Sequence, residues 1–464
     1  MPCMPGRRRE SMMRKQFWQG KPSRWLASII IISVLLRIGS AIYLGNTIRE
    51  LPGIFDQLSY HTLAVRVLEG HGFSFGRLWW PATAPNTPTA HWSFLYTLYL
   101  VAVYAIFGVN PLVARLIQAV SVGVLMPWLV YRIASQLWPE PTDESGWTKG
   151  QKIGVIGAGI VAVYVYFFYY AAALITESFY ITVILWSFDI CLRIVKGEKE
   201  NNRQWVWLGV ALGTAVLLRQ LYLLFIPFQL AWLWWAARPK LRHLLLPLAL
   251  IVLMILPWTI RNYFAFDRFV LLNTNAGYAF FWGNHPIYGT KFIPILPPEM
   301  GSYYSLIPQE LLDQNLNEAA LDTALLKRGI GFVVADPKRY ILLSISRIPS
   351  YFIFWPSPQS STISNISRVA SFGLFLPFML AGLIQSLRQP FASWRERLAS
   401  PFALFYLFML IYTGIHVLTW TLIRYRLPVD AVLILFAGKA IVSLLEWVEK
   451  RRRLLEPTML QDTR

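Results

Sequence analysis

Ten long and largely apolar runs recur along this chain of 464 residues. A helix needs about 20 predominantly apolar residues to cross the hydrocarbon core of a bilayer. The ten runs lie at 25–46, 111–131, 153–173, 178–195, 205–219, 221–236, 244–260, 369–387, 401–422 and 428–447. The pattern predicts an all-α polytopic membrane protein with about ten transmembrane helices.

The composition supports this prediction and separates it from a soluble, nucleic-acid-binding protein. The chain is 56% hydrophobic and 14% charged, whereas a soluble domain carries roughly a quarter charged residues. The net charge of +19 does not indicate nucleic acid, because the lysines and arginines cluster beside the apolar runs, as topology signals do. The two cysteines, Cys3 in the basic tail and Cys191 in an apolar run, predict no disulfide framework.

The basic clusters also order the runs across the membrane, because loops rich in lysine and arginine stay on the cytoplasmic side. A shorter apolar run at 92–108 decides the order. If it crossed the membrane, the basic stretch at 196–204 would lie outside, so we expect 92–108 to lie along the outer surface. The expected arrangement is a cytoplasmic tail at 1–24, a transmembrane domain at 25–447 with external loops at 47–110 and 262–367, and a cytoplasmic tail at 448–464.

The second predicted external loop changes character along its length. Residues 262–300 are rich in Gly, Asn and Pro and are expected to form loops. Residues 315–335 show apolar positions at helical spacing, which predicts a helix on the surface or at the membrane interface. We find no pair of Gly/Pro-broken apolar runs in corresponding halves, the pattern typical of transporters with inverted repeats.

Acids and arginines gather at the ends of the runs that this topology places outside. A carboxylate can deprotonate a hydroxyl or an amine, and arginine binds phosphate through a planar, permanently charged fork. Together they suit a substrate that carries a lipid phosphate. The candidate catalytic residues are Asp56 and Glu177, and the candidate substrate-binding residues are Tyr60, His91, Arg219, Arg261, Asn284, His285, Arg424 and Arg426.

Six stretches, taken in order, resemble a known group of membrane enzymes. They are DQLSYHTLAVRVLEGHGF, TAHWSFLYTLYLVAVYAIFGVNPLVARLIQAV, ALITESFYITVIL, WLGVALGTAVLLRQ, PWTIRNYFAFDRFVLLNTNAGYAFFWGNHP and IRYRLPVDAVLILFAG. From about residue 25 to 445 the chain is similar to the GT-C superfamily of integral-membrane glycosyltransferases. The branch it resembles contains the bacterial relatives of protein O-mannosyltransferases and aminoarabinose transferases, glycosyltransferase family 39.

The resemblance implies a GT-C bundle whose long first external loop carries juxtamembrane helices, and a reaction at the external face. Such enzymes transfer a sugar from a polyprenyl-phosphate donor to an acceptor, usually with inversion. By this resemblance Asp56 is the base, and Glu177 orients the acceptor or helps to hold a metal. His91 lies near the phosphate, which Arg261 and the Arg424/Arg426 pair bind.

Two positions depart from the pattern of the relatives. The relatives typically have His-Pro-Pro-Leu-Tyr where this chain has Trp92 and Ser93 after His91, and many have a second acid where Gln57 follows Asp56. Purely structural explanations are also available. Asp56 is a favoured residue type for a helix cap, an acid such as Glu177 suits the first turn of a helix, and the arginines can anchor span ends at the interface.

A transporter or flippase of lipid-linked sugars is the main alternative function. It would need ionisable residues near the membrane midplane and broken helices, whereas the sequence places only Arg37 clearly inside a run. The histidines and cysteines form no metal-binding pattern, although Asp56 and Glu177 leave a divalent metal possible. The expected partners are the polyprenyl-phosphate sugar and the bilayer, in a bacterial plasma membrane; the sugar and the acceptor (lipid, glycan or protein) are left open.

Overall fold

The structure, a computed structural model, is built from helices and the loops that join them. It describes residues 20–50, 55–140, 146–358 and 360–459. Within these ranges no strand forms, and the only pairing of β type is two isolated bridges within residues 74–88. The predicted all-α polytopic fold is confirmed. Cys3 and much of the predicted N-terminal tail lie outside the described residues, as does the end of the C-terminal tail.

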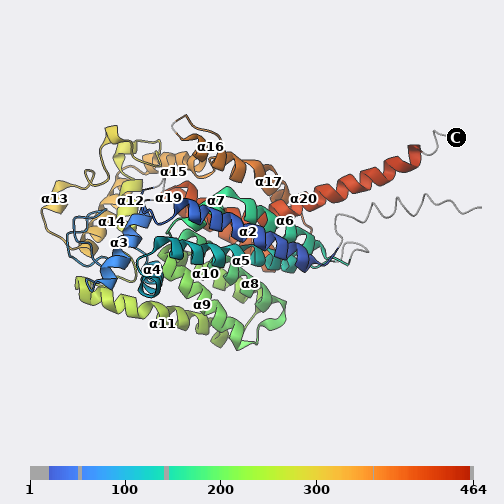
Figure 1. Cartoon of the computed structure of the whole chain (residues 1–464), viewed down its shortest axis with the longest axis horizontal. Helices are drawn as coiled ribbons and strands as arrows, with labels where there is room; N and C mark the ends of the chain where they lie inside the picture. The colour runs from blue at the N-terminus through green and yellow to red at the C-terminus, as the bar shows by residue number, and fades with distance from the viewer. Residues whose placement is uncertain (1–19, 51–54, 141–145, 359, 460–464) are drawn as a thin grey trace, which may run out of the picture.

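Seven helices in the described part of the chain are long and apolar enough to cross a membrane. They are α2 (Pro22–Leu44), α5 (Pro111–Leu137), α8 (Glu177–Arg193) with the π-helical turn that continues it, α11 (Leu241–Phe266), α16 and α17 (Thr362–Arg368 and Leu374–Leu387, joined by a π-helical turn), α19 (Pro401–Leu418) and α20 (Ile423–Met459). They run along the long axis of the molecule, and the last turns of α20 project beyond the bundle (Figure 1).

The other three predicted runs are helical but shorter or broken. Helices α6 (Lys149–Val163) and α7 (Val165–Ala172) pass the same test only as one span bent by 53°. Helices α9 (Asn202–Leu218) and α10 (Ile226–Ala237) have 17 and 12 residues. At 1.5 Å per residue they are about 26 and 18 Å long, less than the roughly 30 Å of a hydrocarbon core.

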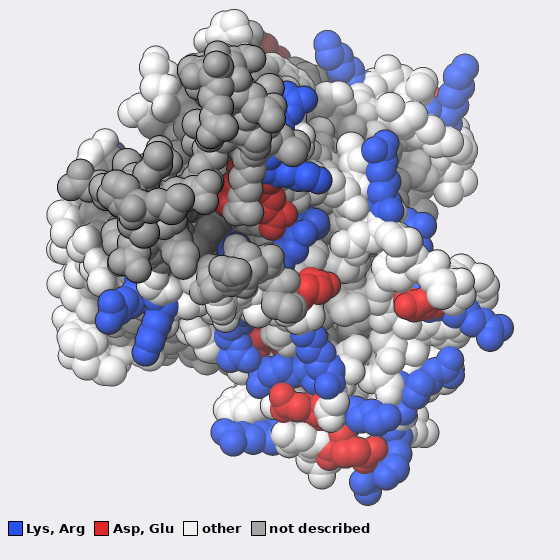
Figure 2. Space-filling model, turned by 90° about the vertical axis from the view of Figure 1, so that its right-hand side faces the viewer, with Lys and Arg blue, Asp and Glu red and all other residues white. Residues whose placement is uncertain are grey.

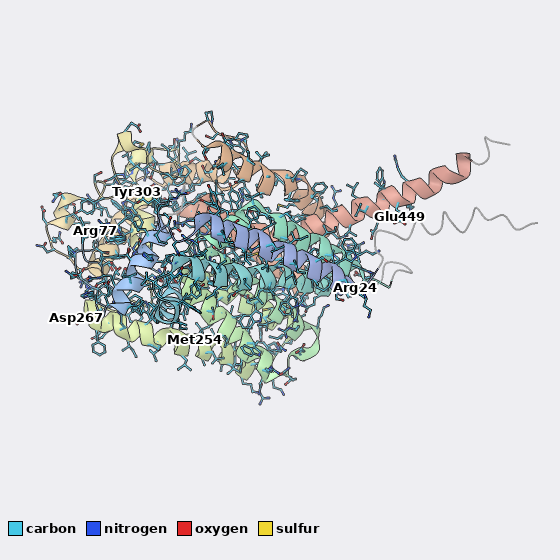
Figure 3. All side chains as sticks on the ribbon, in the orientation of Figure 1. Arg24, Arg77, Met254, Asp267, Tyr303 and Glu449 are labelled. Carbon is cyan, nitrogen blue, oxygen red and sulfur yellow. The ribbon has the colours of Figure 1, made fainter. Side chains whose placement is uncertain are left out.

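Most of the shorter helices gather at one end of the bundle, which we call the loop end. They are α3 (Asp56–Leu68), α4 (Phe94–Phe107), α12 (Ala276–Gly283), α13 (Gln309–Leu312), α14 (Glu318–Ala335) and α15 (Pro337–Tyr351). Figure 3 places Arg77, Asp267 and Tyr303 at this end, and Arg24 and Glu449 at the opposite one, the tail end. The helix predicted at 315–335 is therefore present as α14, and the predicted loops at 262–300 hold only α12 and two short 3-10 turns after α11 ends.

Helix α4 corresponds to the run at 92–108 that the topology argument set apart. Its 14 residues extend about 21 Å, too short to cross a bilayer alone. It packs against α3, α5 and α9, and Ser93 caps its first turn by accepting a hydrogen bond from the Tyr96 amide. Its placement along the outer membrane surface stays a prediction.

The bundle is packed inside and apolar outside. Helices α17 and α20 approach so closely that a Cβ at Gly382 would overlap the carbonyl of Phe436, so only glycine fits there. On the outer surface, Ile31 and Leu35 of α2 and Leu253 of α11 are 59%, 61% and 64% exposed. Broad apolar faces of this kind suit contact with lipid rather than with water.

Candidate functional site

Asp56 is the first residue of α3, but its carboxylate does not serve as the helix cap. The capping position is Phe55, and the Asp56 carboxylate instead accepts a charge-assisted hydrogen bond from the guanidinium of Arg424. Arg424 opens the last helix, 368 residues further along the chain. The loop end thus brings the acid of the first loop against the start of α20.

Three further contacts extend this pair into a row of alternating charges. Arg424 Nε lies 3.5 Å from Glu177 Oε1, and the same oxygen accepts a hydrogen bond from Arg219. Arg219 Nε also donates to Thr176 Oγ1 at 3.0 Å. We call the four side chains Asp56, Arg424, Glu177 and Arg219 the ion array. It has two acids and two arginines, so its formal charge is zero.

The ion array is closed on its inner side and partly open on its outer side. Glu177 and Arg424 are 2% and 9% exposed, whereas Asp56 and Arg219 are each 19% exposed. The Arg219 guanidinium lies 5.3 Å from the centre of the Tyr425 ring and 5.8 Å from that of Tyr180. Aromatic faces favour cations, so these rings hold the arginine in place while leaving the outer edge of the array accessible.

Tyr60 stands one helical turn beyond Asp56 and is buried behind it. Its ring packs edge-on against Trp92 and Tyr96, and its hydroxyl accepts a hydrogen bond from the Ser93 amide at 3.4 Å. Burial, and then the negative charge of Asp56, raise the pKa of the Tyr60 hydroxyl above its usual range. Tyr60 therefore joins α3 to the start of α4 and supports the wall of the site.

Two buried polar residues of α5 position the acids, and the sequence argument did not select them. Arg115 donates to Ala172 O at 2.9 Å, to Thr47 O at 3.1 Å and to Gln57 Oε1 at 3.3 Å. It thereby fixes the chain on both sides of Asp56. The signal for Arg115 was present, because a charged residue inside an apolar span is a functional candidate by default.

Gln118 does the same for the second acid. Its amide donates to the carbonyls of Ala171 and Ala173 at 2.9 and 2.8 Å, and its oxygen accepts from the Tyr96 hydroxyl at 2.9 Å. Ala171 lies in the last turn of α7 and Ala173 is the C-cap of that helix, so neither carbonyl has a partner within a helix. Gln118 therefore sets the position of the turn that ends at Glu177.

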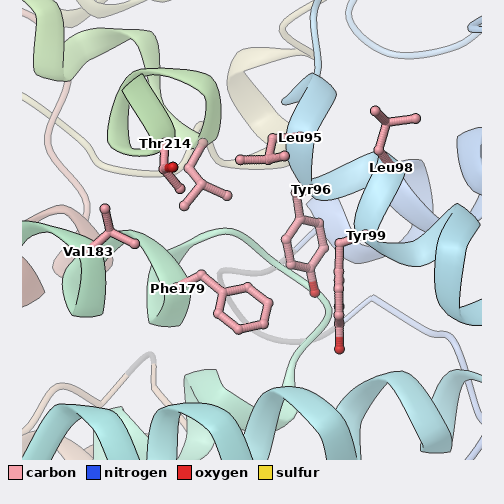
Figure 4. Close-up of a pocket in the computed structure, with 8 residues that line it drawn as sticks. Leu95, Tyr96, Leu98, Tyr99, Phe179, Val183 and Thr214 are labelled. Atoms are coloured by element: carbon pink, nitrogen blue, oxygen red, sulfur yellow. The ribbon is translucent and has the colours of Figure 1, made fainter. Parts of the chain in front are cut away.

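An apolar cavity of about 330 Å³ lies between α4, α8 and α9. Figure 4 shows side chains from α4, α8 and α9 pointing into it, among them Tyr96, Phe179 and Thr214. Phe179 follows Glu177 by two residues, and Leu218, which also lines the cavity, directly precedes Arg219. Two residues that line the cavity are thus close neighbours in the chain of members of the ion array, although no member of the array lines it.

Arg426 is only two residues from Arg424 but does not join the ion array. It is fully buried, and its Nε donates to Asp430 Oδ1 at 2.9 Å, one turn along the same helix. It also donates to the carbonyl of Tyr351 at 2.7 Å. Residues two apart point in different directions from a helix, so the predicted pair of phosphate-binding arginines is divided between two places.

His91 lies in the loop before α4, and Arg261 lies in the last turns of α11. His91 is buried among the rings of Trp80, Trp92 and Tyr278, and burial lowers its pKa below the usual range. Arg261 donates to Thr89 O at 3.0 Å and stacks over Trp258 at 4.6 Å. The described hydrogen bonds and ion pairs include none between either residue and the ion array.

Glu318 holds these loops together and was also missed. Its carboxylate accepts hydrogen bonds from Thr83 Oγ1 and Thr89 Oγ1, both at 2.7 Å, from the Ala90 amide at 2.8 Å and from Thr274 Oγ1. A buried carboxylate needs such donors to offset its lost hydration. No short-range pattern in the sequence links residue 318 to residue 83, so no signal was available.

Asn284 and His285 lie in another cluster, under α15. Asn284 accepts a hydrogen bond from Arg347 at 2.9 Å, and its own carbonyl accepts one from Arg339 at 2.9 Å. Partial burial, and then the charge of Arg339, lower the pKa of His285 to about 4. These hydrogen bonds hold the loop after α12 in place. The hydrogen bonds of the described residues include none between Asn284 or His285 and the ion array.

Comparison with known proteins identifies the architecture. A family model described as dolichyl-phosphate-mannose-protein mannosyltransferase matches residues 92–260. No curated protein matches the chain by sequence. The resemblance to GT-C glycosyltransferases that the sequence predicted is confirmed by this match together with the fold.

Solved structures of very different sequence share the fold. The archaeal oligosaccharyltransferase AglB from Archaeoglobus fulgidus, in complex with an inhibitory peptide and a dolichol-phosphate, is 15% identical over 93% of this chain with a TM-score of 0.55. The Archaeoglobus fulgidus oligosaccharyltransferase in complex with Zn and sulfate is 13% identical over 91% of the chain, with a TM-score of 0.54. This chain covers 52% and 50% of the length of those two chains.

Proposed function

We propose that this protein transfers a sugar from a polyprenyl-phosphate-linked donor to a hydroxyl or amine acceptor at the external membrane face, with inversion. The observation that carries the proposal is the ion array, in which Asp56 of the first loop pairs with Arg424, and Glu177 contacts both Arg424 and Arg219. A lipid phosphate is also part of the description of the family that matches 92–260, and the AglB complex contains a dolichol-phosphate.

In the proposed reaction the acceptor oxygen or nitrogen attacks the anomeric carbon while Asp56 takes its proton. The bond from that carbon to the phosphate oxygen breaks, and the lipid phosphate leaves with its electron pair. Arg424 and Arg219 stabilise the phosphate charge as it develops, the kind of electrostatic assistance that contributes most to many enzymes. Glu177 holds both guanidiniums in position, since its Oε1 contacts Arg219 and Arg424 at the same time.

The ion array also suggests how donor binding prepares the base. Arg424 is shared between Asp56 and Glu177. A phosphate offers a guanidinium two oxygens at once, so we expect the donor phosphate to draw Arg424 away from Asp56. The carboxylate is then free to accept the proton of the acceptor.

The apolar cavity between α4, α8 and α9 is the proposed seat for the first part of the lipid chain. Phe179 and Leu218 line it and are close in the chain to Glu177 and Arg219, so we propose that an apolar segment bound there has its phosphate near those groups. Its volume of about 330 Å³ is at the small end of the range for ligand pockets. The remainder of a long polyprenyl chain would therefore extend into the bilayer.

A bound metal is not required by this arrangement. Asp56 and Glu177 are the acids that a divalent cation would use, but each is already paired with an arginine. No group of three potential metal ligands occurs in the described parts of the chain. Because the two arginines already balance both carboxylates, we propose that transfer persists in the presence of EDTA; loss of transfer that added metal restores would show that a divalent metal takes part.

The proposed orientation places the ion array outside and the tail end in the cytoplasm of a bacterial plasma-membrane protein. Figure 2 looks onto the tail end, where lysines and arginines are scattered widely with few acids between them. Basic residues concentrate on the cytoplasmic side of membrane proteins. Both termini and the tails at 1–24 and 448–464 would then be cytoplasmic.

One observation favours the alternative, a flippase for lipid-linked sugars. The break between α6 and α7 falls at Tyr164, whose hydroxyl donates to the buried Asp430 Oδ2 at 2.7 Å. Asp430 is in turn paired with Arg426. A broken helix beside a buried ion pair is typical of transporters. Movement of a fluorescent lipid-linked sugar across proteoliposomes, without any transferred product, would support this alternative.

The decisive experiment compares the parent protein with Asp56→Asn in membranes supplied with radiolabelled polyprenyl-phosphate sugars. Asparagine keeps the size and one oxygen but cannot take a proton, so we expect transfer to fall about 100- to 10,000-fold. Asp336→Asn is the matched control, because Asp336 caps α15 and asparagine caps equally well. Retention of most of the activity by Asp56→Asn would contradict the proposed mechanism.

A further inference from the structure

A second cavity, of about 470 Å³, lies at the loop end between the first external segment and the end of α11. One wall is formed by residues 71–74, a second by Asn86 and Pro88, and a third by the last turns of α11 from Arg261 to Ala265. The proposed function does not use this cavity.

Among the described residues, the positive charge at the walls of the cavity has no acid in direct contact with it. The guanidinium of Arg261 is bound by the carbonyls of Thr89 at 3.0 Å and Phe73 at 3.4 Å, which are neutral. Arg66 stands behind the opposite wall and donates to Asn86 Oδ1 at 2.8 Å and to Ser74 Oγ at 3.1 Å. Within the described residues neither Arg66 nor Arg261 forms an ion pair, whereas both arginines of the ion array do.

The nearest acids do not fill this role. Glu318 lies behind Thr89 and attracts Arg261 through space, but the described residues show no ion pair between them, and the two Glu318 oxygens accept hydrogen bonds from four other donors. Glu69 and Asp267 are exposed at helix ends and do not line the cavity. Two arginines with only neutral partners, and His71 on the rim, therefore make the cavity suited to an anionic group.

The cavity also opens beside the lipid-facing side of α11. Phe264, which lines it, is 81% exposed, and Tyr263 and Ile260 on the same helix are 52% and 48% exposed. Figure 3 shows that α11 runs from its middle at Met254 to Asp267 at the loop end along the outside of the bundle. Aromatic residues concentrate where a membrane helix meets the headgroup region.

We infer that this cavity binds the phosphate of a membrane lipid headgroup. The phosphate would lie between Arg261 and the wall held by Arg66, and the acyl chains would pass over Phe264 along α11. The chemistry that recognises a soluble phosphate is the same, but the apolar exit over Phe264 favours a lipid. The inference goes beyond the proposed function and is independent of it, because it concerns lipid binding away from the ion array.

The test is a thermal-shift titration of the full-length protein in detergent with phosphatidylglycerol, phosphatidylcholine and inorganic phosphate. We expect phosphatidylglycerol to raise the melting temperature more than phosphatidylcholine, whose headgroup has no net charge. His71→Glu and Asn86→Asp each add a negative charge to the cavity wall at an exposed position. Each should weaken the apparent affinity for phosphatidylglycerol about 10-fold, the loss of one charge-assisted interaction.

Asn315→Asp is the matched control. Asn315 is exposed and has a backbone φ of 50°, and Asn86 has a φ of 57°, so the same substitution is made in the same backbone conformation. The control should bind phosphatidylglycerol like the parent. Equal affinity in the parent and both cavity variants would overturn the inference. If inorganic phosphate alone reproduces the shift, and the cavity variants abolish it, the site takes a soluble phosphate and the lipid assignment is wrong.

Discussion

Arg424 and Arg426 are two residues apart in one helix, yet they occupy opposite kinds of environment. Arg424 reaches outward and joins three side chains that come from α3, α8 and the end of α9. Arg426 points inward and pairs with Asp430 of its own helix, with both side chains fully buried. The first arrangement depends on the whole fold, and the second depends mainly on the local repeat of a helix.

The comparison teaches that the charge of Arg424 is available to a ligand, whereas the charge of Arg426 serves only the structure. A buried ion pair with no access to substrate can act only on stability and specificity, and its net contribution to stability is often small. The ion array keeps Asp56 and Arg219 partly exposed, so a ligand can compete for its arginines. Substitutions at the two arginines should therefore have different consequences.

The largest expected effect on stability is at the buried pair. Arg426→Met leaves Asp430 buried and without its cation, and removing one partner of such a pair costs about 3–5 kcal/mol. We expect a large fall in melting temperature or in the yield of folded protein, measured by fluorescence-detected size exclusion. The double variant Arg426→Met/Asp430→Leu should recover much of the loss; no recovery would mean that the pair supports the fold in some further way.

Arg424→Gln should have the largest effect on transfer with a smaller effect on folding. Loss of one group that stabilises transition-state charge lowers kcat by about 100- to 1000-fold. We expect the variant to fold, because Asp56, the acid that loses its arginine, is 19% exposed and can be hydrated, and to fail in the radiolabelled transfer assay. Arg238→Gln, at an exposed turn after α10, provides the matched control. Full activity in Arg424→Gln would remove the ion array from the mechanism.

A smaller effect is expected at Asp322, an acid that has no cation partner among the described residues. Burial raises its pKa to about 7, although the amides of Tyr278 and Gly277 donate to it. A raised carboxyl pKa means that the folded state holds a proton which the unfolded state has lost above about pH 4. The contribution of Asp322 to stability should therefore be full below pH 4 and decline up to about pH 7.

Melting curves of the parent and Asp322→Asn between pH 4 and pH 8 check this point. The variant cannot lose a proton, so its melting temperature should decline less over that interval than that of the parent. Identical pH profiles for the two proteins would show that Asp322 is paired or hydrated in solution. Either result defines how a buried acid without a cation partner differs in its pH response from Asp56 and Glu177, which are each paired with an arginine.

Much of the fold was predictable because it follows from local pattern. All ten apolar runs are helical, and α14 stands where helical spacing predicted it. The lengths were less predictable, since α9 and α10 are too short to meet the criterion for a full span and α6 breaks at Tyr164. The sequence argued against a transporter because it placed only Arg37 clearly inside an apolar run. In the structure Arg426 and Asp430 are also buried within a span, so that argument is weaker.

The sequence by itself determined the membrane class, the helical segments and the acids at the starts of α3 and α8, because hydrophobic length and motif order are properties of short stretches. Only the tertiary structure decided which arginine meets Asp56, that Arg115 and Gln118 hold the turns beside the acids, and that Glu318 closes the loops. These contacts join residues up to 368 positions apart. Their formation depends on how the helices rotate and pack, which no local pattern records.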